Sequence, residues 1–366
     1  MIKLNLRFLP RLILHCFAFQ AALFSLQSLP ASAAEQSRFV GAGPFSVSIQ
    51  SVENQGLLLM PAGTSSAANK RWPAVVFAHG LCGPAEKYAA SLTRLASWGF
   101  MVLASQQQSD CGVMNLNRPM ATLGNLFRLP TKFGNAVDFS AMGNTIRSNL
   151  GYLSGRSDVD TSRLALMGHS MGGGMVIDVA SELAEEQPDL VKAVVAIAPW
   201  NGVQPTPSTV VQNIHHPLLI VCSMSDALCP CSGEVQLSDT QGILTGNVSL
   251  GIPLLFGPSE DSTWHGGAMA IFNNAKEAIL MDVSKVSHFT IAGIDGGAEM
   301  QTFADWATRQ SGLNFNRPDR AYTDIPTMEY SIAFLNLALD LDPQAGRAFL
   351  DGASSDSRLV RTLRSQ

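Results

Sequence analysis

The sequence predicts an α/β fold in which a mostly parallel sheet of about eight strands carries helices on both faces. First, short apolar runs alternate with longer helical patterns along the chain, which is typical of parallel strands joined by helices. Second, each apolar run ends in a polar or glycine-rich corner. Third, 46% of the 366 residues are hydrophobic and only 14% are charged, which favours one large core over a disordered or repetitive chain.

The N-terminal segment, residues 1–33, has the pattern of a signal peptide. A basic start, an apolar stretch and a small-residue cleavage site follow one another at Lys3, Arg7 and Arg11, at residues 12–29 and at Ala31-Ser32-Ala33. A retained membrane anchor is the alternative, because the apolar stretch approaches the ~20 residues that span a bilayer. Cleavage predicts a secreted or periplasmic protein without stable membrane insertion, and leaves residues 34–366 as a single domain.

The charge balance argues against nucleic acid as a partner. Removal of residues 1–33 takes away three basic residues and no acidic ones, so the formal charge changes from −5 to −8. The sequence has no basic stripe that could neutralise phosphates. The basic C-terminal residues Arg358, Arg361 and Arg364 have the pattern of a solvated helix end.

Eight apolar runs are expected to form the sheet. An antiparallel pair opens it, and six further strands follow, at residues 45–52 and 56–60, then 74–78, 100–104, 164–167, 193–197, 218–221 and 278–283. Helical patterns occupy residues 86–98, 136–153 and 171–186. Residues 112–135 match no element, and residues 232–266 are predicted to form a long loop or lid insertion, because connections of this length are usually functional or disordered.

Five cysteines follow the predicted cleavage site, namely Cys82, Cys111, Cys222, Cys229 and Cys231. In an oxidising compartment Cys82 and Cys111 would bridge two loops, whereas Cys229 or Cys231 would pair with each other or with Cys222. The sequence leaves this connectivity open. No metal is expected, because the closely spaced Cys229 and Cys231 lack the second pair of ligands that a closed zinc site requires.

The most specific motif is Gly168-His169-Ser170-Met171-Gly172, which lies directly between an apolar strand and an Ala/Val-rich helical pattern. In that context G-x-S-x-G is the nucleophile elbow of the α/β-hydrolase fold, where a serine sits on a sharp strained turn. Glycines two positions to either side remove side chains that would collide. Ser170 is therefore the predicted nucleophile.

Two backbone amides are predicted to form an oxyanion hole. The Met171 N–H lies at a helix N-terminus, where the helix dipole and unpaired donors favour negative charge. The second donor should come from the loop after the third strand, where the chain reads His79-Gly80-Leu81, and Leu81 N–H is the candidate. We expect His79 to brace this loop rather than to act as a base.

A serine nucleophile needs an imidazole base and a carboxylate that fixes the tautomer of that base. The fold places them in the chain order Ser, Asp, His, each after a strand. Asp226 follows the strand at 218–221 and is the predicted acid, and His288 follows the strand at 278–283 and is the predicted base. Rivals in the long connection are Asp239, Asp261 and His265.

With these residues placed, residues 45–288 resemble the bacterial cutinase and polyester-hydrolase group of α/β-hydrolases and the neighbouring chlorophyllase-like and dienelactone-hydrolase-like branches. The resemblance rests on residues 168–174, on Ile197-Ala198-Pro199-Trp200 and on residues 217–226. It implies that Trp200 is a substrate-binding wall of the acyl site, although a core or rim tryptophan would fit the same pattern. His79-Gly80-Leu81 replaces the Pro-Gly-aromatic corner of cutinases and suits the chlorophyllase-like branch.

The predicted function is a secreted serine carboxylic-ester hydrolase that acts through an acyl-enzyme and needs no cofactor. Its expected partner is a small-molecule or polymeric ester. A chlorophyllase-like or lipase-type esterase and a peptidase are alternatives among enzymes. A catalytically silent binding protein of the same fold is the alternative from another class.

Overall fold

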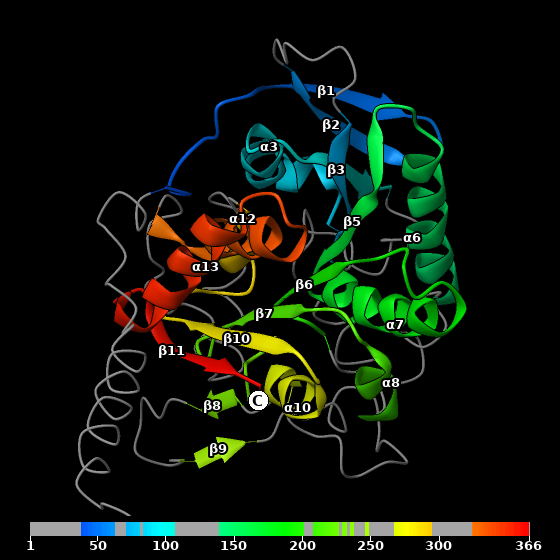
Figure 1. Cartoon of the computed structure of the whole chain (residues 1–366). Coiled ribbons are helices and arrows are strands. Elements are labelled where there is room, and N and C mark those ends of the chain that lie inside the picture. Colours follow the sequence, from blue (N-terminus) through cyan, green and yellow to red (C-terminus); the bar gives the residue numbers. More distant parts are fainter. Residues whose placement is uncertain are drawn as a thin grey trace, which may run out of the picture.

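The central element is a nine-stranded sheet whose strands follow the order β1-β2-β4-β3-β5-β6-β7-β10-β11 (Figure 1). The computed structural model describes residues 38–62, 71–80, 83–106, 139–200, 208–226, 229–232, 235–237, 246–248, 267–294 and 324–365. The strands are β1 (Ser46–Val52), β2 (Gly56–Ala62), β3 (Trp72–Ala78), β4 (Met101–Ser105), β5 (Val159–His169), β6 (Ala193–Ile197), β7 (Leu218–Cys222), β10 (Ala278–Val283) and β11 (Leu359–Arg364).

The strand directions confirm the predicted mostly parallel sheet. From β4 through β10 all neighbouring strands are parallel, whereas β1 pairs antiparallel with β2 and β2 antiparallel with β4. All eight predicted strands are present, with boundaries within two residues except that β5 begins at Val159. Its extra residues continue the pairing, because Val159 lies opposite Trp72 of β3.

Helices cover both faces of the sheet, as predicted. The helices on one face are α3 (Ala89–Ser97), α12 (Thr327–Ala338) and α13 (Pro343–Asp351), and those on the other are α6 (Phe139–Ser154), α7 (Met171–Glu186), α8 (Ser208–Asn213) and α10 (Gly267–Asn274). Alternate residues of β3 supply the two cores: Val75 and Phe77 pack with the first group, Val76 with the second. Strand alternation explains this division.

The predicted helices differ in detail from the observed ones. The expected helix over residues 86–98 is a short 3₁₀ turn, η1 (Ala85–Tyr88), continued by α3. The helix α6 begins three residues after its predicted start, and α7 has the predicted boundaries. The helices α8, α10, α12 and α13 were not predicted.

The C-terminal arginines do not form a solvated helix end, so that prediction is wrong. Two of them belong to β11, which pairs antiparallel with β10 and places Arg361 directly opposite Asp282. Arg361 Nε lies 3.4 Å from Asp282 Oδ2, Arg358 pairs with Glu329 and Asp356, and Arg364 pairs with Asp351. These acidic partners come from distant parts of the chain, and the local sequence pattern does not reveal them.

Several predictions concern residues that the structure does not describe. The predicted signal peptide at 1–33 and the unassigned residues 112–135 lie outside the described residues, as does most of the connection at 232–266. Within that connection, β8 (Val235–Leu237) and β9 (Gly246–Val248) form a separate antiparallel pair. Among the described helices, none has both the length and the apolar character needed to cross a membrane.

Candidate active site

Ser170 occupies a strained turn between β5 and α7. Its backbone has φ 56° and ψ −123°, a conformation that costs a non-glycine residue of order 1–3 kcal/mol and persists only where its surroundings enforce it. The Ser170 N–H donates to the Ile197 carbonyl at 2.9 Å, and the Ser170 carbonyl accepts from the N–H groups of Gly174 at 3.1 Å and Trp200 at 2.8 Å. Residues from β6 and its following loop therefore hold the turn.

The flanking glycines leave no room for a side chain. A Cβ atom on Gly168 would lie 2.2 Å from the Gly172 carbonyl oxygen, and one on Gly172 would lie 2.2 Å from the Ala78 carbonyl oxygen. Both distances are far below van der Waals contact, so the steric reason inferred from the motif is confirmed. The tight turn lets β3 and α7 approach each other around Ser170.

The structure brings Ser170, His288 and Asp226 into one hydrogen-bonded chain. Each follows a different parallel strand, β5, β10 and β7, at the carboxyl edge of the sheet. His288 Nε2 lies 2.8 Å from Ser170 Oγ, and His288 Nδ1 lies 2.7 Å from Asp226 Oδ2. Because an ionised carboxylate only accepts hydrogen bonds, Nδ1 carries the proton and Nε2 is left to accept from the serine hydroxyl.

All three side chains are largely withdrawn from solvent. The exposed fractions are 8% for Ser170, 5% for His288 and 1% for Asp226. In such surroundings hydrogen bonds are electrostatically stronger than in water, and unpaired polar groups are costly. The arrangement can therefore move a proton from hydroxyl to imidazole without first displacing bulk water from between them.

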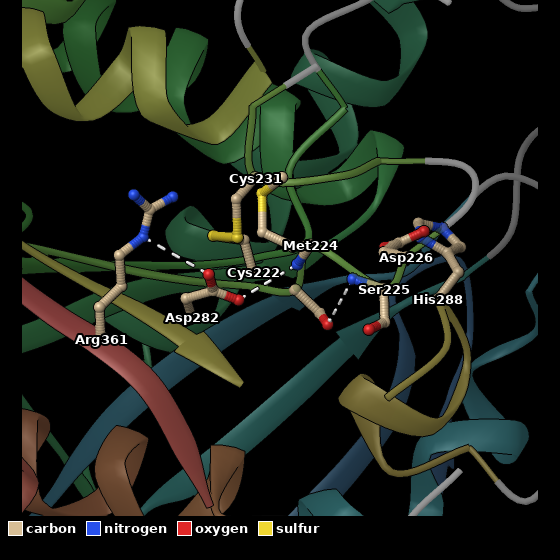
Figure 2. The surroundings of a disulfide bond; sticks show 9 residues. Cys222, Met224, Ser225, Asp226, Cys231, Asp282, His288 and Arg361 are labelled. Atoms are coloured by element: carbon tan, nitrogen blue, oxygen red, sulfur yellow. Dashed lines mark hydrogen bonds and ion pairs between the residues drawn. A yellow bond between two sulfur atoms is a disulfide. The ribbon is translucent and has the colours of Figure 1, made fainter. Parts of the chain in front are cut away.

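A disulfide joins the two ends of the loop that carries Asp226. Cys222 and Cys231 form a disulfide across it, with Cα atoms 5.2 Å apart. Figure 2 shows this disulfide beside Asp282, whose carboxylate accepts a hydrogen bond from the Met224 N–H at 3.1 Å and faces Arg361. Of the pairings that the sequence left open, Cys222 with Cys231 is the one present, whereas Cys82 and Cys111 lie outside the described residues.

Cys229 is a neighbour of the site that sequence reasoning did not assign. Its backbone N–H donates to Asp226 Oδ1 at 2.9 Å, which engages the second oxygen of that carboxylate. Its thiol is buried, free and in contact with the Ser170 side chain. Burial, reinforced by the Asp226 charge, raises the pKa of the Cys229 thiol well above its ordinary value, so it stays protonated. The nearby cysteine pattern gave no signal for this placement.

Removing the disulfide should weaken both the fold and the site. The double substitution Cys222→Ser, Cys231→Ser removes a cross-link between cysteines with a sequence separation of 9, and the loop-entropy model values such a short loop at about 2–3 kcal/mol. We expect a lower melting temperature, and a kcat lower by about tenfold because Asp226 loses its fixed position. Scanning calorimetry and ester kinetics measure the two effects. Dithiothreitol should reproduce them in the wild type and change nothing further in the variant; an unchanged wild type would contradict the prediction.

The structure describes one of the two predicted oxyanion donors, Met171, but not the other, Leu81. Met171 is the first residue of α7, so its N–H belongs to the amides that lack an intrahelical acceptor. Leu81 lies outside the described residues, although Gly80 directly before it lies against the elbow. A Cβ atom on Gly80 would be 3.1 Å from Ser170 Cβ. The corner after β3 therefore approaches the serine as the fold requires.

Trp200 lies next to the elbow through its backbone. Its N–H donates to the Ser170 carbonyl, and its own carbonyl oxygen would lie 2.2 Å from a Cβ atom on Gly174. Its partly buried side chain packs against the hydrophobic core on the α3 and α12 face. Its assignment as a substrate wall stays a prediction.

The remaining candidates are placed as follows. His79 Nδ1 lies 2.7 Å from the Gly80 carbonyl oxygen, and burial lowers the pKa of His79. It thus contacts its own loop, whereas His288 is the histidine beside Ser170. The rivals Asp239, Asp261 and His265 lie outside the described residues. Within the described ranges, no group of three or more His, Cys, Asp or Glu side chains is arranged to hold a metal ion.

The fold and the site together define an α/β-hydrolase: a mostly parallel sheet, a serine on the strained turn between β5 and α7, and an acid and a histidine after later strands. Comparison with known proteins agrees with this class. A family model for PET hydrolase-like proteins matches residues 27–236. Because this match covers more than half of the sequence, the chain belongs to the PET hydrolase-like family.

Curated relatives match this chain over only part of their length. A bis(hydroxyethyl) terephthalate hydrolase of Streptomyces coelicolor is 28% identical over 202 residues, which are 53% of this chain and 54% of that protein. Cutinase 1 of Thermobifida cellulosilytica and a cutinase of Thermobifida fusca are each 31% identical over 196 residues, 53% of this chain. These matches span 64% and 56% of the two cutinases, so the chain covers less than two thirds of each relative.

Proposed function

We propose that the protein is a serine-dependent carboxylic-ester hydrolase of the cutinase and polyesterase type. The observation that carries the proposal is the hydrogen-bonded chain from Ser170 through His288 to Asp226, with 2.8 Å and 2.7 Å between the paired atoms. Such a chain is the standard means by which proteins turn a serine hydroxyl into a nucleophile. Relatives named as cutinases and as a terephthalate ester hydrolase support the ester as the substrate class.

The reaction proceeds in two acyl-transfer steps. Ser170 Oγ attacks the ester carbonyl carbon while its proton passes to His288 Nε2, and Asp226 stabilises the imidazolium that results. The Met171 and Leu81 N–H groups stabilise the oxyanion. His288 then protonates the departing alkoxide, which leaves as the alcohol, while the acyl group stays esterified to Ser170 as the acyl-enzyme. Water attacks this ester with His288 as base, and collapse of the second intermediate releases the acid and restores the serine proton.

The proposal extends to the cellular location and to the acyl site. Residues 1–33 act as a signal peptide, and the mature protein works outside the cytoplasm. The Cys222–Cys231 disulfide supports this, because structural disulfides persist mainly in oxidising compartments. Trp200 forms a flat wall of the acyl site, next to the turn that carries the nucleophile, which suits aromatic or extended esters.

Covalent labelling tests the proposal directly. A fluorophosphonate probe should label the wild-type protein stoichiometrically and leave Ser170→Ala unlabelled, because only an activated serine reacts with it. Ser181→Ala is the matched control, since Ser181 is a buried serine on the same helix α7, and this variant should be labelled like the wild type. Absence of labelling in the wild type would favour a silent binding protein; equal labelling of Ser170→Ala would reject Ser170 as the nucleophile.

A substrate panel separates the remaining enzyme classes. We expect turnover of short p-nitrophenyl esters and of bis(hydroxyethyl) terephthalate, and no turnover of the matching anilides. Preference for long acyl chains with activation at an oil interface would indicate a lipase instead. Cleavage of the anilides at comparable rates would indicate a peptidase.

A further inference from the structure

The Tyr88 hydroxyl lies at the meeting point of three chain segments next to the catalytic serine. Tyr88 ends η1 and is almost completely buried. Its oxygen accepts a hydrogen bond from the Gly80 N–H at 2.9 Å and lies 2.9 Å from His169 Nδ1. Gly80 belongs to the corner after β3, and His169 immediately precedes the nucleophile. One hydroxyl therefore contacts both the oxyanion corner and the elbow.

The polarity of these contacts can be assigned from their partners. The Gly80 N–H can only donate, so the Tyr88 oxygen accepts there and its own O–H is available for His169 Nδ1. His169 Nε2 then carries the ring proton and donates it to the His288 backbone carbonyl at 2.9 Å. The hydrogen bonds thus run in one direction, from Gly80 through Tyr88 and His169 to the backbone of the proposed base.

The protonation states agree with this assignment. Burial, with the nearby His288 imidazole adding to it, lowers the pKa of His169 well below its ordinary value, so the ring is neutral and Nδ1 can accept. Burial raises the pKa of Tyr88, so its hydroxyl keeps the proton that it donates. Each of the two side chains is therefore in the form that the hydrogen bonds require.

The three segments pack closely around Gly80. A Cβ atom on Gly80 would lie 3.1 Å from the Tyr88 oxygen and 3.2 Å from His169 Nδ1, as well as 3.1 Å from Ser170 Cβ. The His169 ring lies 5.7 Å from the Tyr88 ring and 4.7 Å from the His288 ring, measured between centroids. Contacts this close transmit a displacement of one segment to the next.

We propose that Tyr88 and His169 are positioning residues that hold the oxyanion corner and the His288 backbone in register with Ser170. The inference rests on the proposed esterase function. Neither residue exchanges a proton with substrate. The Tyr88 hydroxyl fixes the Gly80 amide one residue before the predicted donor Leu81, and His169 fixes the main chain from which the His288 imidazole extends. Both act on groups that matter most in the transition state, where small errors in placement are costly.

Tyr88→Phe tests the first link, because it removes the hydroxyl and keeps the ring. We expect kcat for a short p-nitrophenyl ester to fall by about 10- to 100-fold with KM within about threefold of the wild type. Tyr330→Phe is the matched control, since the buried Tyr330 hydroxyl instead donates to Asp356 at 2.8 Å, and Asp356 belongs neither to the candidate triad nor to the contacts of Tyr88. It should lose stability without losing kcat. Rates are expressed per fluorophosphonate-reactive site, so that misfolded protein does not count.

His169→Leu and His169→Gln test the second link independently of Tyr88 and keep the proposal testable if Tyr88→Phe fails to fold. Glutamine retains an amide donor for the His288 carbonyl, whereas leucine does not. We expect kcat of His169→Leu to fall by about 10- to 100-fold relative to the wild type. We expect kcat of His169→Gln to be at least about fivefold higher than that of His169→Leu. Equal kcat values for the two variants, or a Tyr88→Phe variant with wild-type kcat, would overturn the proposal.

Failure of the esterase function itself gives a different result. In that case the wild type neither turns over esters nor reacts at Ser170, and the positioning role fails together with it. If the wild type is active through Ser170 while the Tyr88 and His169 variants keep its kcat, the positioning role alone is wrong. A change in KM alone, with kcat unchanged, would likewise overturn it, because the positions of the oxyanion donors and of the base affect kcat.

Discussion

Ser170→Ala is expected to lower kcat for short esters by about 10⁵- to 10⁶-fold, the largest effect of any single substitution in this chain. The Ser170 hydroxyl lies 2.8 Å from His288 Nε2, and alanine at this position leaves no oxygen there to act as the nucleophile. Triad members act as a unit, and loss of the serine from comparable sites removes almost all of the rate. What remains is direct attack by water, assisted by the oxyanion donors and by binding.

The measurement requires control of contamination and of folding. Stopped assays with p-nitrophenyl butyrate, on protein purified with fresh resin, give kcat, and the melting temperature reports the fold. The strained backbone at residue 170 is unchanged by the substitution, because alanine also disfavours φ 56°. We therefore expect a melting temperature within a few degrees of the wild type. Residual kcat above a tenth of the wild-type value would remove Ser170 from the mechanism.

Asp226→Asn should have the second-largest effect, a fall in kcat of about 10³- to 10⁴-fold with little change in KM. The substitution is nearly isosteric, and its amide oxygen can still accept from the Cys229 N–H. The amide nitrogen would then face His288 Nδ1 and donate to it, which forces the proton of the imidazole onto Nε2. In that tautomer Nε2 points a hydrogen at the Ser170 hydroxyl and cannot accept its proton.

Asp356→Asn is the matched control for this change. Asp356 is a partly buried carboxylate, but it accepts from Tyr330 and pairs with Arg358 just before β11 begins, and it is not part of the candidate triad. Its substitution should lower the melting temperature and leave kcat within about threefold of the wild type. If Asp226→Asn also kept kcat within tenfold of the wild type, the acid of the triad would have to be sought elsewhere.

The sheet and the candidate triad could be predicted because both depend on short-range patterns and on chain order. The runs that became β3, β4, β6 and β7 are continuous apolar segments of strand length, as expected of strands buried on both faces. The spacing of Gly168, Ser170 and Gly172 is sufficient to predict the turn between β5 and α7. Once that turn is placed, the parallel order of strands restricts the acid and the histidine to a few loops.

The features that escaped prediction depend on three-dimensional contacts that the local sequence pattern does not reveal. Tyr88 and His169 are 81 residues apart in the chain, and His169 and the carbonyl that it contacts are 119 apart. The disulfide partner of Cys222 could not be chosen until the 5.2 Å between two Cα atoms was known. The strand β11 was mistaken for a helix end because Arg361 appears solvated until Asp282 is found opposite to it.

The parallel pairing of β7 with β10 determines which insertions and deletions the candidate site can accept. Cys222 pairs with Asp282 at the ends of the two strands, so the bases of the loops that carry Asp226 and His288 are spaced by interstrand hydrogen bonds. The number of residues that connect the strands does not enter this spacing. Insertions and deletions between residues 232 and 266 are therefore expected to leave the separation of the carboxylate and the imidazole unchanged.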